Sequence, residues 1–370
     1  MAAPDRSAGG GGRKMGWVDI LKRYGLRGTV DLSAERVGPL GAAQLSELLK
    51  HNTTVQGLDL RETGLGAEGC TKIAEMLKTN KTIRHIDLAS NAIEDEGATA
   101  IARAIAHNTT LAKLELQRNG ISAAGAKYMS ASLRVNTTLE YLGFAFNGFG
   151  DQGATYLAEV MAGVNTTLKH LDLGFNGVCV EGARSLAWGL RENHWLETLE
   201  LGYNGIMDRG AADIAEAVRV NTVLTQLGIP ANGITDAGAR TLSTALVMNQ
   251  TLVQMGLSSN NIGDEGARDV AEMLCTNSTL ETLYLEENDV TIDGEGANAL
   301  LRVLHQTRSI KPLKQELQLA FMMAGHKRLG QGSWAHVLDP AICQYIVKSA
   351  AYQKDRDIQF YPKTEGMGAG

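Results

Sequence analysis

Apolar and polar residues alternate along this chain in a short row that recurs at a nearly constant spacing. Each row reads leucine-x-x-leucine-x-leucine-x-x-asparagine-x-isoleucine, for example at Leu111, Leu114, Leu116, Asn119 and Ile121. The interval between rows is 28 residues at every step except one of 29. The rows begin at Val55, Ile83, Leu111, Leu139, Leu168, Leu196, Leu224, Leu252 and Leu280. This regularity excludes chance, so most of the chain repeats one structural unit.

The alternation at the start of each row predicts a short β-strand. Its leucines point into a core, and the residues between them face outward. The asparagine that follows is placed where the strand turns away. We expect its side-chain amide to bond backbone groups of neighbouring rows that would otherwise be buried without partners. These asparagines are Asn91, Asn119, Asn147, Asn176, Asn204, Asn232, Asn260 and Asn288.

A helix is predicted in the second half of each row. It begins near an aspartate, such as Asp264, which we expect to cap the first free amides of that helix. Small and aliphatic residues then occupy one side, as at Ala98, Ile101 and Ala102. The aspartates expected to act in the same way are Asp95, Asp151, Asp208 and Asp236.

One such unit cannot bury its own apolar face, so neighbouring rows must stack. Because helices are wider than strands, the stack must curve. We therefore predict an α/β solenoid with parallel strands on the concave face and helices on the convex face. We divide the chain into a disordered tail (1–14), an N-terminal cap with an imperfect first repeat (15–54), the repeats (55–325) and a C-terminal cap or tail (326–370). A short helix at 337–347 is either a lid over the last row or a docking segment.

The row resembles the ribonuclease-inhibitor type of leucine-rich repeat, and it is similar to the repeat region of NOD-like receptors. The resemblance covers about residues 26 to 325. It implies the curved fold and binding on the inner face. It does not imply one activity, because proteins with this repeat inhibit ribonucleases, sense ligands, stimulate the GTPase Ran or act as scaffolds.

Composition and motifs argue against several other functions. The net charge of -6 and the isoelectric point near 5.8 disfavour nucleic acid as a partner. The four cysteines lie far apart without metal-site spacing, so we expect no metal and no cofactor. No apolar run is long enough to span a membrane, and we expect a cytoplasmic protein, with organelle targeting by the first residues as an alternative. The glycine-rich segment 325–337 resembles a kinase loop or P-loop but lacks the required lysine and downstream elements.

Seven asparagines occupy sequences that would accept N-linked glycans in a secreted protein. They recur with the repeat, so we interpret them as structural turns between helix and strand. They are Asn52, Asn80, Asn108, Asn136, Asn165, Asn249 and Asn277. Two histidines on the open strand face, His85 and His170, have no converging catalytic partners, and we expect solvated side chains there.

Outward strand positions are the candidate binding site. The middle column is mostly acidic and contains Asp59, Asp87, Glu115, Asp172, Glu200 and, in the last regular row, Tyr284. The column before the asparagine contains Phe146, Phe175 and Tyr203 in consecutive rows, near Tyr141. We expect these rings to form a shallow apolar pocket of the kind found in binding hot spots. Alternatively, they only cover the turn edge and pack on one another.

The combined prediction is a non-enzymatic interaction scaffold or ligand-binding subunit. Its acidic and aromatic concave face would recognise a protein with a basic or mixed basic and apolar surface. The alternative is a GTPase-activating protein similar to the Ran activator, although the acidic C-terminal tract that this resemblance implies is missing.

Overall fold

The computed structural model describes residues 21, 25–291, 294–310 and 318–320, and it describes side chains as far as residue 303. The chain divides into two units, Met1–Ala324 and Gly325–Gly370, and the first contains all described residues. The predicted tail (1–14), most of the predicted N-terminal cap before residue 25, the predicted C-terminal segment (326–370) and its helix lie outside the described residues.

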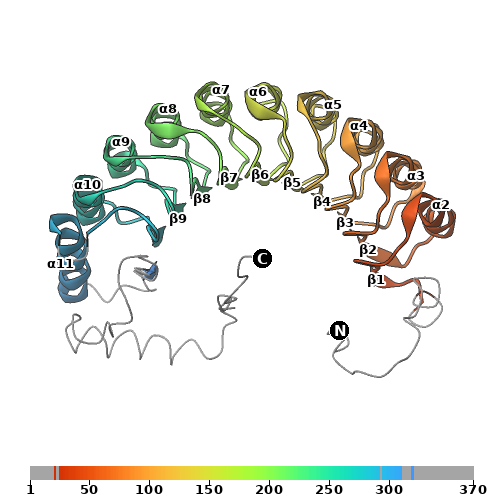
Figure 1. Cartoon of the computed structure of the whole chain (residues 1–370), viewed down its shortest axis with the longest axis horizontal. Helices are drawn as coiled ribbons and strands as arrows, with labels where there is room; N and C mark the ends of the chain where they lie inside the picture. The colour runs from red at the N-terminus through yellow and green to blue at the C-terminus, as the bar shows by residue number, and fades with distance from the viewer. Residues whose placement is uncertain (1–20, 22–24, 292–293, 311–317, 321–370) are drawn as a thin grey trace, which may run out of the picture. The chain divides into compact units, whose positions relative to one another are not determined.

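Strands and helices alternate through the first unit. Within the described residues, the strands form one 11-stranded parallel sheet in sequence order, and Figure 1 shows them along the inner side of an arc with the helices outside. The strands are β1 (Gly28–Asp31), β2 (Val55–Asp59), β3 (His85–Asp87), β4 (Lys113–Glu115), β5 (Tyr141–Gly143), β6 (His170–Asp172), β7 (Thr198–Glu200), β8 (Gln226–Gly228), β9 (Gln254–Gly256), β10 (Thr282–Tyr284) and β11 (Gln318–Ala320).

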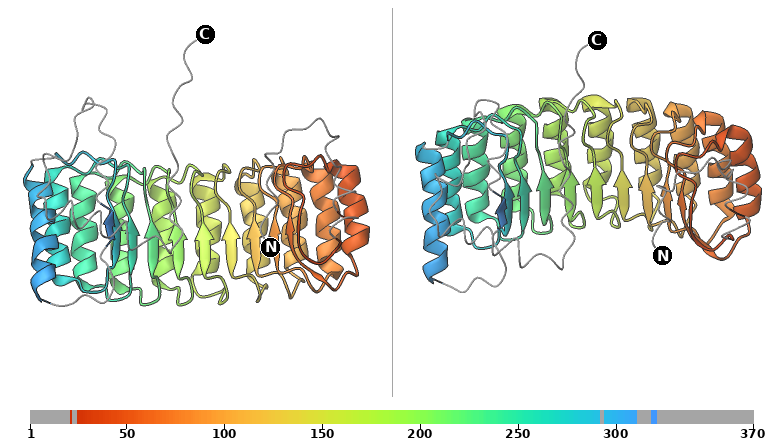
Figure 2. Two further views of the ribbon diagram at one scale, coloured as in Figure 1. Left: turned by 90° about the horizontal axis from the view of Figure 1, so that it is seen from below. Right: turned by 60° about the horizontal axis from the view of Figure 1, so that its bottom comes forward.

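One helix follows each of the first ten strands. The helices are α2 (Gly38–Leu49), α3 (Gly66–Thr79), α4 (Glu94–Ile105), α5 (Ala123–Leu133), α6 (Gly150–Met161), α7 (Val180–Arg191), α8 (Met207–Val220), α9 (Asp236–Met248), α10 (Asp264–Thr276) and α11 (Glu295–Ile310). Figure 2 looks onto the strand face and shows the strands side by side in front of the helices. The predicted α/β solenoid is confirmed.

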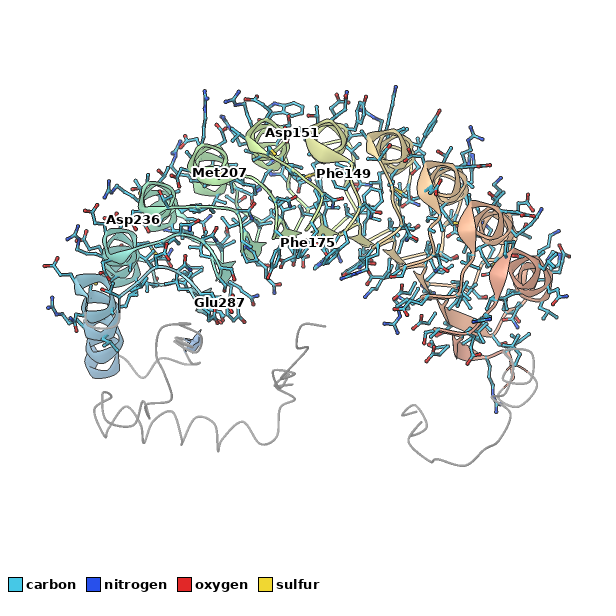
Figure 3. All side chains as sticks on the ribbon, viewed as in Figure 1. Phe149, Asp151, Phe175, Met207, Asp236 and Glu287 are labelled. Atoms are coloured by element: carbon cyan, nitrogen blue, oxygen red, sulfur yellow. The ribbon has the colours of Figure 1, made fainter. Side chains whose placement is uncertain are left out.

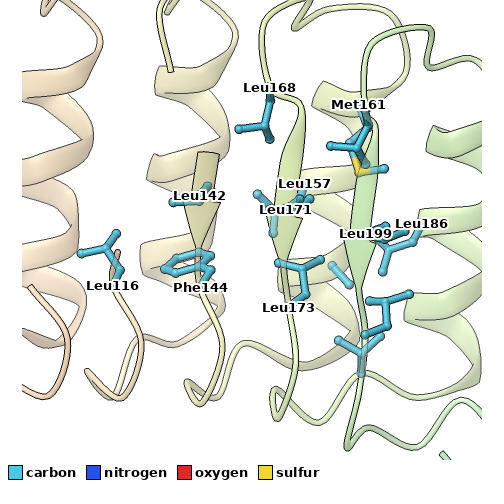
Figure 4. Close-up of a cluster of buried hydrophobic side chains, with 14 of the residues drawn as sticks. Leu116, Leu142, Phe144, Leu157, Met161, Leu168, Leu171, Leu173, Leu186 and Leu199 are labelled. Carbon is cyan, nitrogen blue, oxygen red and sulfur yellow. The ribbon is translucent and has the colours of Figure 1, made fainter. Parts of the chain in front are cut away.

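The core lies between the sheet and the helices. Equivalent leucines pair from row to row, as Leu114 with Leu142 and Leu142 with Leu171. All three are fully buried, and Figure 4 shows Leu142 and Leu171 facing apolar side chains of the helix layer, such as Leu157. Removal of this apolar surface from water is what holds neighbouring rows together. The predicted inward and outward alternation of the strands is therefore confirmed.

The row asparagines connect neighbouring turns, as predicted. Asn119 Nδ2 donates to the carbonyl oxygens of Leu88 and Leu116, each at 3.0 Å, and Asn119 Oδ1 accepts from the amide of Asn91 at 2.9 Å. The side chain is 1% exposed. Each such asparagine supplies partners to backbone groups that have no strand or helix to bond.

The helix-to-strand turns contain a second set of bonded asparagines. Asn108 Nδ2 donates to the carbonyl oxygen of Leu77 at 2.7 Å, and its Oδ1 accepts from the amides of Thr110 and Leu111. Because the amide nitrogen is buried and engaged, the structural interpretation of the glycan-like sequences is confirmed at this turn and at the equivalent buried Asn80, Asn136, Asn165 and Asn249.

The capping prediction for the aspartates is wrong in one respect. Asp95 lies in the first turn of α4, but its Oδ1 accepts from the amides of Ser122 and Gly125 at the start of α5, at 2.8 and 2.9 Å. The carboxylate lies beside the next row, so the free amides within its reach belong to the following helix. Asp151, Asp208 and Asp236 do the same, and Asp264 accepts from the amide of Thr291, in the turn before α11. These aspartates therefore join neighbouring helices rather than capping their own.

No helix among the described residues is both long and apolar enough to cross a membrane.

Candidate partner-binding surface

The position before each row asparagine has an unusual backbone. In every row from Ala34 to Glu287 this residue has a positive φ, with values of 53°, 55° and 56° at Phe146, Phe175 and Tyr203. A left-handed conformation costs a residue with a Cβ atom about 1 kcal/mol, and glycine adopts it freely. Backbone preference therefore does not explain three consecutive aromatic residues at this position. Figure 3 shows Phe175 on the inner side of the arc.

The three rings form a continuous stack, which we call the aromatic ladder. Phe146 and Phe175 stack with centroids 3.8 Å apart, and Phe175 and Tyr203 with centroids 4.0 Å apart. The guanidinium of Arg118 lies 4.1 Å from the centroid of Phe146 and covers the first face. The rings thus pack on one another, as the alternative interpretation expected. They nevertheless stay accessible, since Phe175 is 36% and Tyr203 50% exposed.

A second, shorter stack runs along the strands beside the ladder. Tyr141 and His170 stack with centroids 4.2 Å apart, and Lys113 Nζ lies 4.1 Å from the Tyr141 centroid. Burial lowers the pKa of His170, and burial together with nearby Glu115 raises the pKa of Tyr141. The expectation of a solvated His170 is therefore wrong, because the ring packs on its neighbour one row back.

Acidic residues at the N-terminal end of the middle column are paired within the chain. Arg61 contacts Asp59 at 2.6 Å and Asp87 at 3.3 Å. Lys113 Nζ lies 2.8 Å from Glu115, which is only 8% exposed. Burial still raises the pKa of Asp87 to about 6, and Arg61 offsets only part of this effect. The acidic character of β2 to β4 is therefore largely neutralised before any partner arrives.

Acidic residues in the centre of the column have no such partners. Asp172 Oδ1 accepts from the amide of Gly174 at 3.0 Å, but no described lysine or arginine pairs with Asp172 or Glu200. Burial raises the pKa of both carboxyl groups, and that of Glu200 reaches about 7 because Asp172 is also near. A Cβ atom at Gly228 would overlap Glu200 Oε2, so the carboxylate lies over the next strand. These two acids therefore share one part of the face without a lysine or arginine partner among the described residues.

The structure brings most of the predicted site residues onto one face. Tyr284 in β10 lies apart from the aromatic ladder, because the row of β10 is the third after that of Tyr203. Arg61, Lys113, Arg118 and His170 were not predicted to belong to the site, although each occupies an outward column. The predicted members on the strands are Asp59, Asp87, Glu115, Tyr141, Asp172, Glu200 and Tyr284, and those in the following turns are Phe146, Phe175 and Tyr203.

The described interior offers little room for a ligand. A void lined by Leu133, Leu157 and Met161 has space of about 10 Å³, enough for one water molecule. Among the described residues, no group of histidine, cysteine, aspartate or glutamate side chains could hold a metal ion.

Two family models match the chain. The model described as Leucine Rich repeat matches residues 164–187, 192–215 and 249–271. The chain is a leucine-rich repeat protein. The model of the TMOD/LMOD Leucine-rich domain matches residues 39–148 of this leucine-rich repeat protein. A solved structure titled "Leiomodin-1 Actin-Binding Site 2 (ABS2)" is 21% identical, covers 41% of this chain and 89% of its own, and has a TM-score of 0.34. No curated protein matches the chain significantly.

Proposed function

We propose that the chain is a non-catalytic scaffold that binds a protein on its concave face. The observation that carries the proposal is the aromatic ladder. Three rings occupy backbone positions that disfavour them, stack in register and remain accessible to solvent. Aromatic side chains on a rigid scaffold contribute much of the binding free energy in protein interfaces.

The charge of the same face supports the choice of partner. Asp172 and Glu200 lie unpaired beside the ladder, so a partner surface that combines basic and apolar groups would complement both features. Concave surfaces of repeat arrays serve as extended binding sites, and leucine-rich repeat families are typically binding domains.

We also propose a cytoplasmic location and a repeat of the ribonuclease-inhibitor type. Cys70, Cys179 and Cys275 are free thiols, which suits a reducing compartment. The buried asparagines of the helix-to-strand turns leave their glycan-like sequences without an accessible acceptor.

The test compares affinity capture by wild-type protein with capture by the double variant Phe175→Ala and Tyr203→Ala. A matched control is Trp188→Ala, which removes an aromatic ring of similar exposure, 51%, from α7 on the helix layer. We expect mass spectrometry to show partners that the control retains and the double variant loses. The melting temperature of the double variant should fall by only a few degrees, since both rings are partly exposed.

The opposite pattern would refute the proposal. If the double variant keeps its partners and the control loses them, recognition occurs on the helix layer. If the double variant instead unfolds at the assay temperature, the rings serve stability rather than capture.

A further inference from the structure

The aromatic ladder is closed at one end and open at the other. Arg118 covers the first ring face on Phe146 at 4.1 Å. At the far end, the residue that follows Tyr203 in the same column is Ala231, whose methyl group is too short to cover a ring. Tyr203 is accordingly the most exposed ring of the ladder. One ring face of the ladder is therefore left without a cationic cover.

Carboxylates lean into the space beyond this ring from both sides. Glu200 Oε2 lies over Gly228, in the row that follows Tyr203. From the row of β10, Glu287 Oε2 accepts a hydrogen bond from Ser259 Oγ at 2.8 Å, and Glu286 bonds Ser258 in the same way. Figure 3 shows Glu287 on the inner side of the arc, like Phe175. The carboxylates thus face rows whose outward residues near the ladder, Gly228, Ala231, Gly256 and Ser259, have small side chains.

The strands and turns of those rows contain no positively charged residue, and the arginines of the same rows lie in the helices. Residues 221–239, 249–267 and 277–291 include no lysine, arginine or histidine, whereas the earlier rows supply Arg61, Lys113 and Arg118 on the same face. Glu200 has no described cationic partner. In the N-terminal half of the concave face, lysine and arginine side chains of the chain pair with the acidic residues. In the C-terminal half, such a cation would have to come from another molecule.

We propose that an arginine side chain of the partner stacks on the open face of Tyr203 and pairs with Glu200. The inference rests on the proposed function and names the partner's chemistry at that site. The chain makes contacts of the same kind within itself. Arg118 stacks on Phe146, and Lys113 both lies over the Tyr141 ring and pairs with Glu115. A guanidinium suits the position because it is planar, always charged and able to stack while it donates to a carboxylate.

The spacing of the face allows a polypeptide to reach the ring. Adjacent strands lie about 4.8 Å apart, so the backbones of the rows of β7 and β10 are separated by about 14 Å. Between them, the outward positions beside the ladder are Gly228, Pro230, Ala231, Gly256, Ser258 and Ser259, and Gln226 and Gln254 face outward at the start of the two strands. An extended segment or a single helix of about 10 Å diameter fits this width.

The first experiment measures binding of a fluorescein-labelled peptide of alternating arginine and alanine to the full chain at low ionic strength. We expect Tyr203→Ala and Glu200→Gln each to weaken binding about threefold, as for a cation–π contact and an exposed ion pair. Asp59→Asn is the matched control, because Asp59 is already paired with Arg61 and lies in β2, five strands away from Glu200 in β7. A peptide with citrulline in place of arginine should bind at least fivefold more weakly than the arginine peptide.

The second experiment introduces an arginine in the chain itself to cover the exposed ring face of Tyr203. Ala231 already has a φ of 52°, close to the 56° of Arg118, so the backbone accepts a long side chain there. We expect Ala231→Arg to cover Tyr203, to reduce binding of the arginine peptide about tenfold and to leave the melting temperature unchanged or higher. Ala231→Gln, similar in length but uncharged, should reduce binding less than threefold.

The outcomes separate this inference from the proposed function. Equal binding of the peptide by wild type, Tyr203→Ala and Ala231→Arg would overturn the arginine site, and so would an equal loss in Asp59→Asn. If, in that case, Phe175→Ala with Tyr203→Ala still abolishes capture of the partner, binding on the concave face stands and only its arginine chemistry fails. If the substitutions change neither peptide binding nor capture of the partner, both the arginine site and the proposed function are overturned.

Discussion

Replacement of Glu200 by glutamine tests the electrostatics of the concave face directly. Burial and the neighbouring Asp172 raise the pKa of Glu200 from 4.5 to about 7. A carboxyl group with a raised pKa in the folded state favours folding fully below pH 4.5, and this advantage is lost as the pH rises through 7. Above pH 7 the carboxylate is charged in both states, but in the folded protein this charge is partly buried and unpaired, whereas in the unfolded chain it is fully hydrated.

The size of the effect follows from the shift. The rise in the pKa of Glu200 from 4.5 to about 7 corresponds to a loss of folding free energy of at most about 3 kcal/mol when the carboxyl group ionises. Because Glu200 is partly exposed, solvent screening reduces the expected gain from Glu200→Gln to about 1 to 2 kcal/mol at pH 8. At pH 4 the glutamate is neutral in both states, and the gain should disappear.

The measurement is urea or thermal unfolding of wild type and Glu200→Gln at pH 4, 6 and 8. Glu197→Gln serves as the control, since Glu197 is an exposed glutamate of the same row. A stabilisation by Glu200→Gln that is the same at pH 4 and pH 8 would show that packing, and not charge, causes it. A destabilisation at pH 8 would show that an unrecognised cation pairs with Glu200, and the electrostatic account would fail.

Three further substitutions test other parts of the architecture. Asn176→Ala should lower the free energy of unfolding by about 3 kcal/mol in urea titrations, because Asn176 Nδ2 donates to the Phe144 and Gly174 carbonyls at 3.0 Å and the side chain is 2% exposed; a loss below 1 kcal/mol would contradict this. Asp208→Ala should lower the free energy of unfolding by about 1 kcal/mol, because Asp208 Oδ1 accepts hydrogen bonds from the amides of Thr235 and Gly238 at 2.7 and 3.0 Å. Hydrogen exchange at these two amides should become faster, and faster exchange in α8 instead would restore the original capping prediction. Gly228→Ala should push the Glu200 carboxylate toward water and bring its pKa down toward 4.5, and an unchanged NMR titration would argue that the carboxylate does not lie over Gly228.

The sequence alone predicted the repeated architecture well. The repeat of about 28 residues identifies which residues are buried, because Leu114, Leu142 and Leu171 occupy equivalent positions with the same neighbours. It also identifies the asparagines as backbone partners, since a buried turn must satisfy its polar groups. Both predictions depend on chemistry that every row repeats, so the repeat itself supplies the evidence.

Contacts between different rows were harder to predict. Asp95 bonds Ser122 across 27 residues, and a sequence row does not reveal which helix an aspartate faces once the rows stack. The Tyr141 stack with His170 escaped notice for the same reason. Pairing of Arg61 with Asp59 and Asp87 depends on how long side chains lie across neighbouring strands, so a count of acidic positions overstated the free charge at that end. The sequence showed that Phe146, Phe175 and Tyr203 share one column, but only the structure shows that their rings stack on one another.

The aspartate bonds between helices also have a mechanical consequence. Within the described chain, they link α4 to α5, α6 to α7, α8 to α9 and α9 to α10. The corresponding position is Pro39 in α2, Ala67 in α3, Ala123 in α5 and Val180 in α7, so the junctions that follow these four helices lack the bond. The junctions after α5 and α7 lie behind the rows that carry the aromatic ladder. We expect these junctions to resist bending less than those with the aspartate bond, which would let the rings adjust their spacing to a partner.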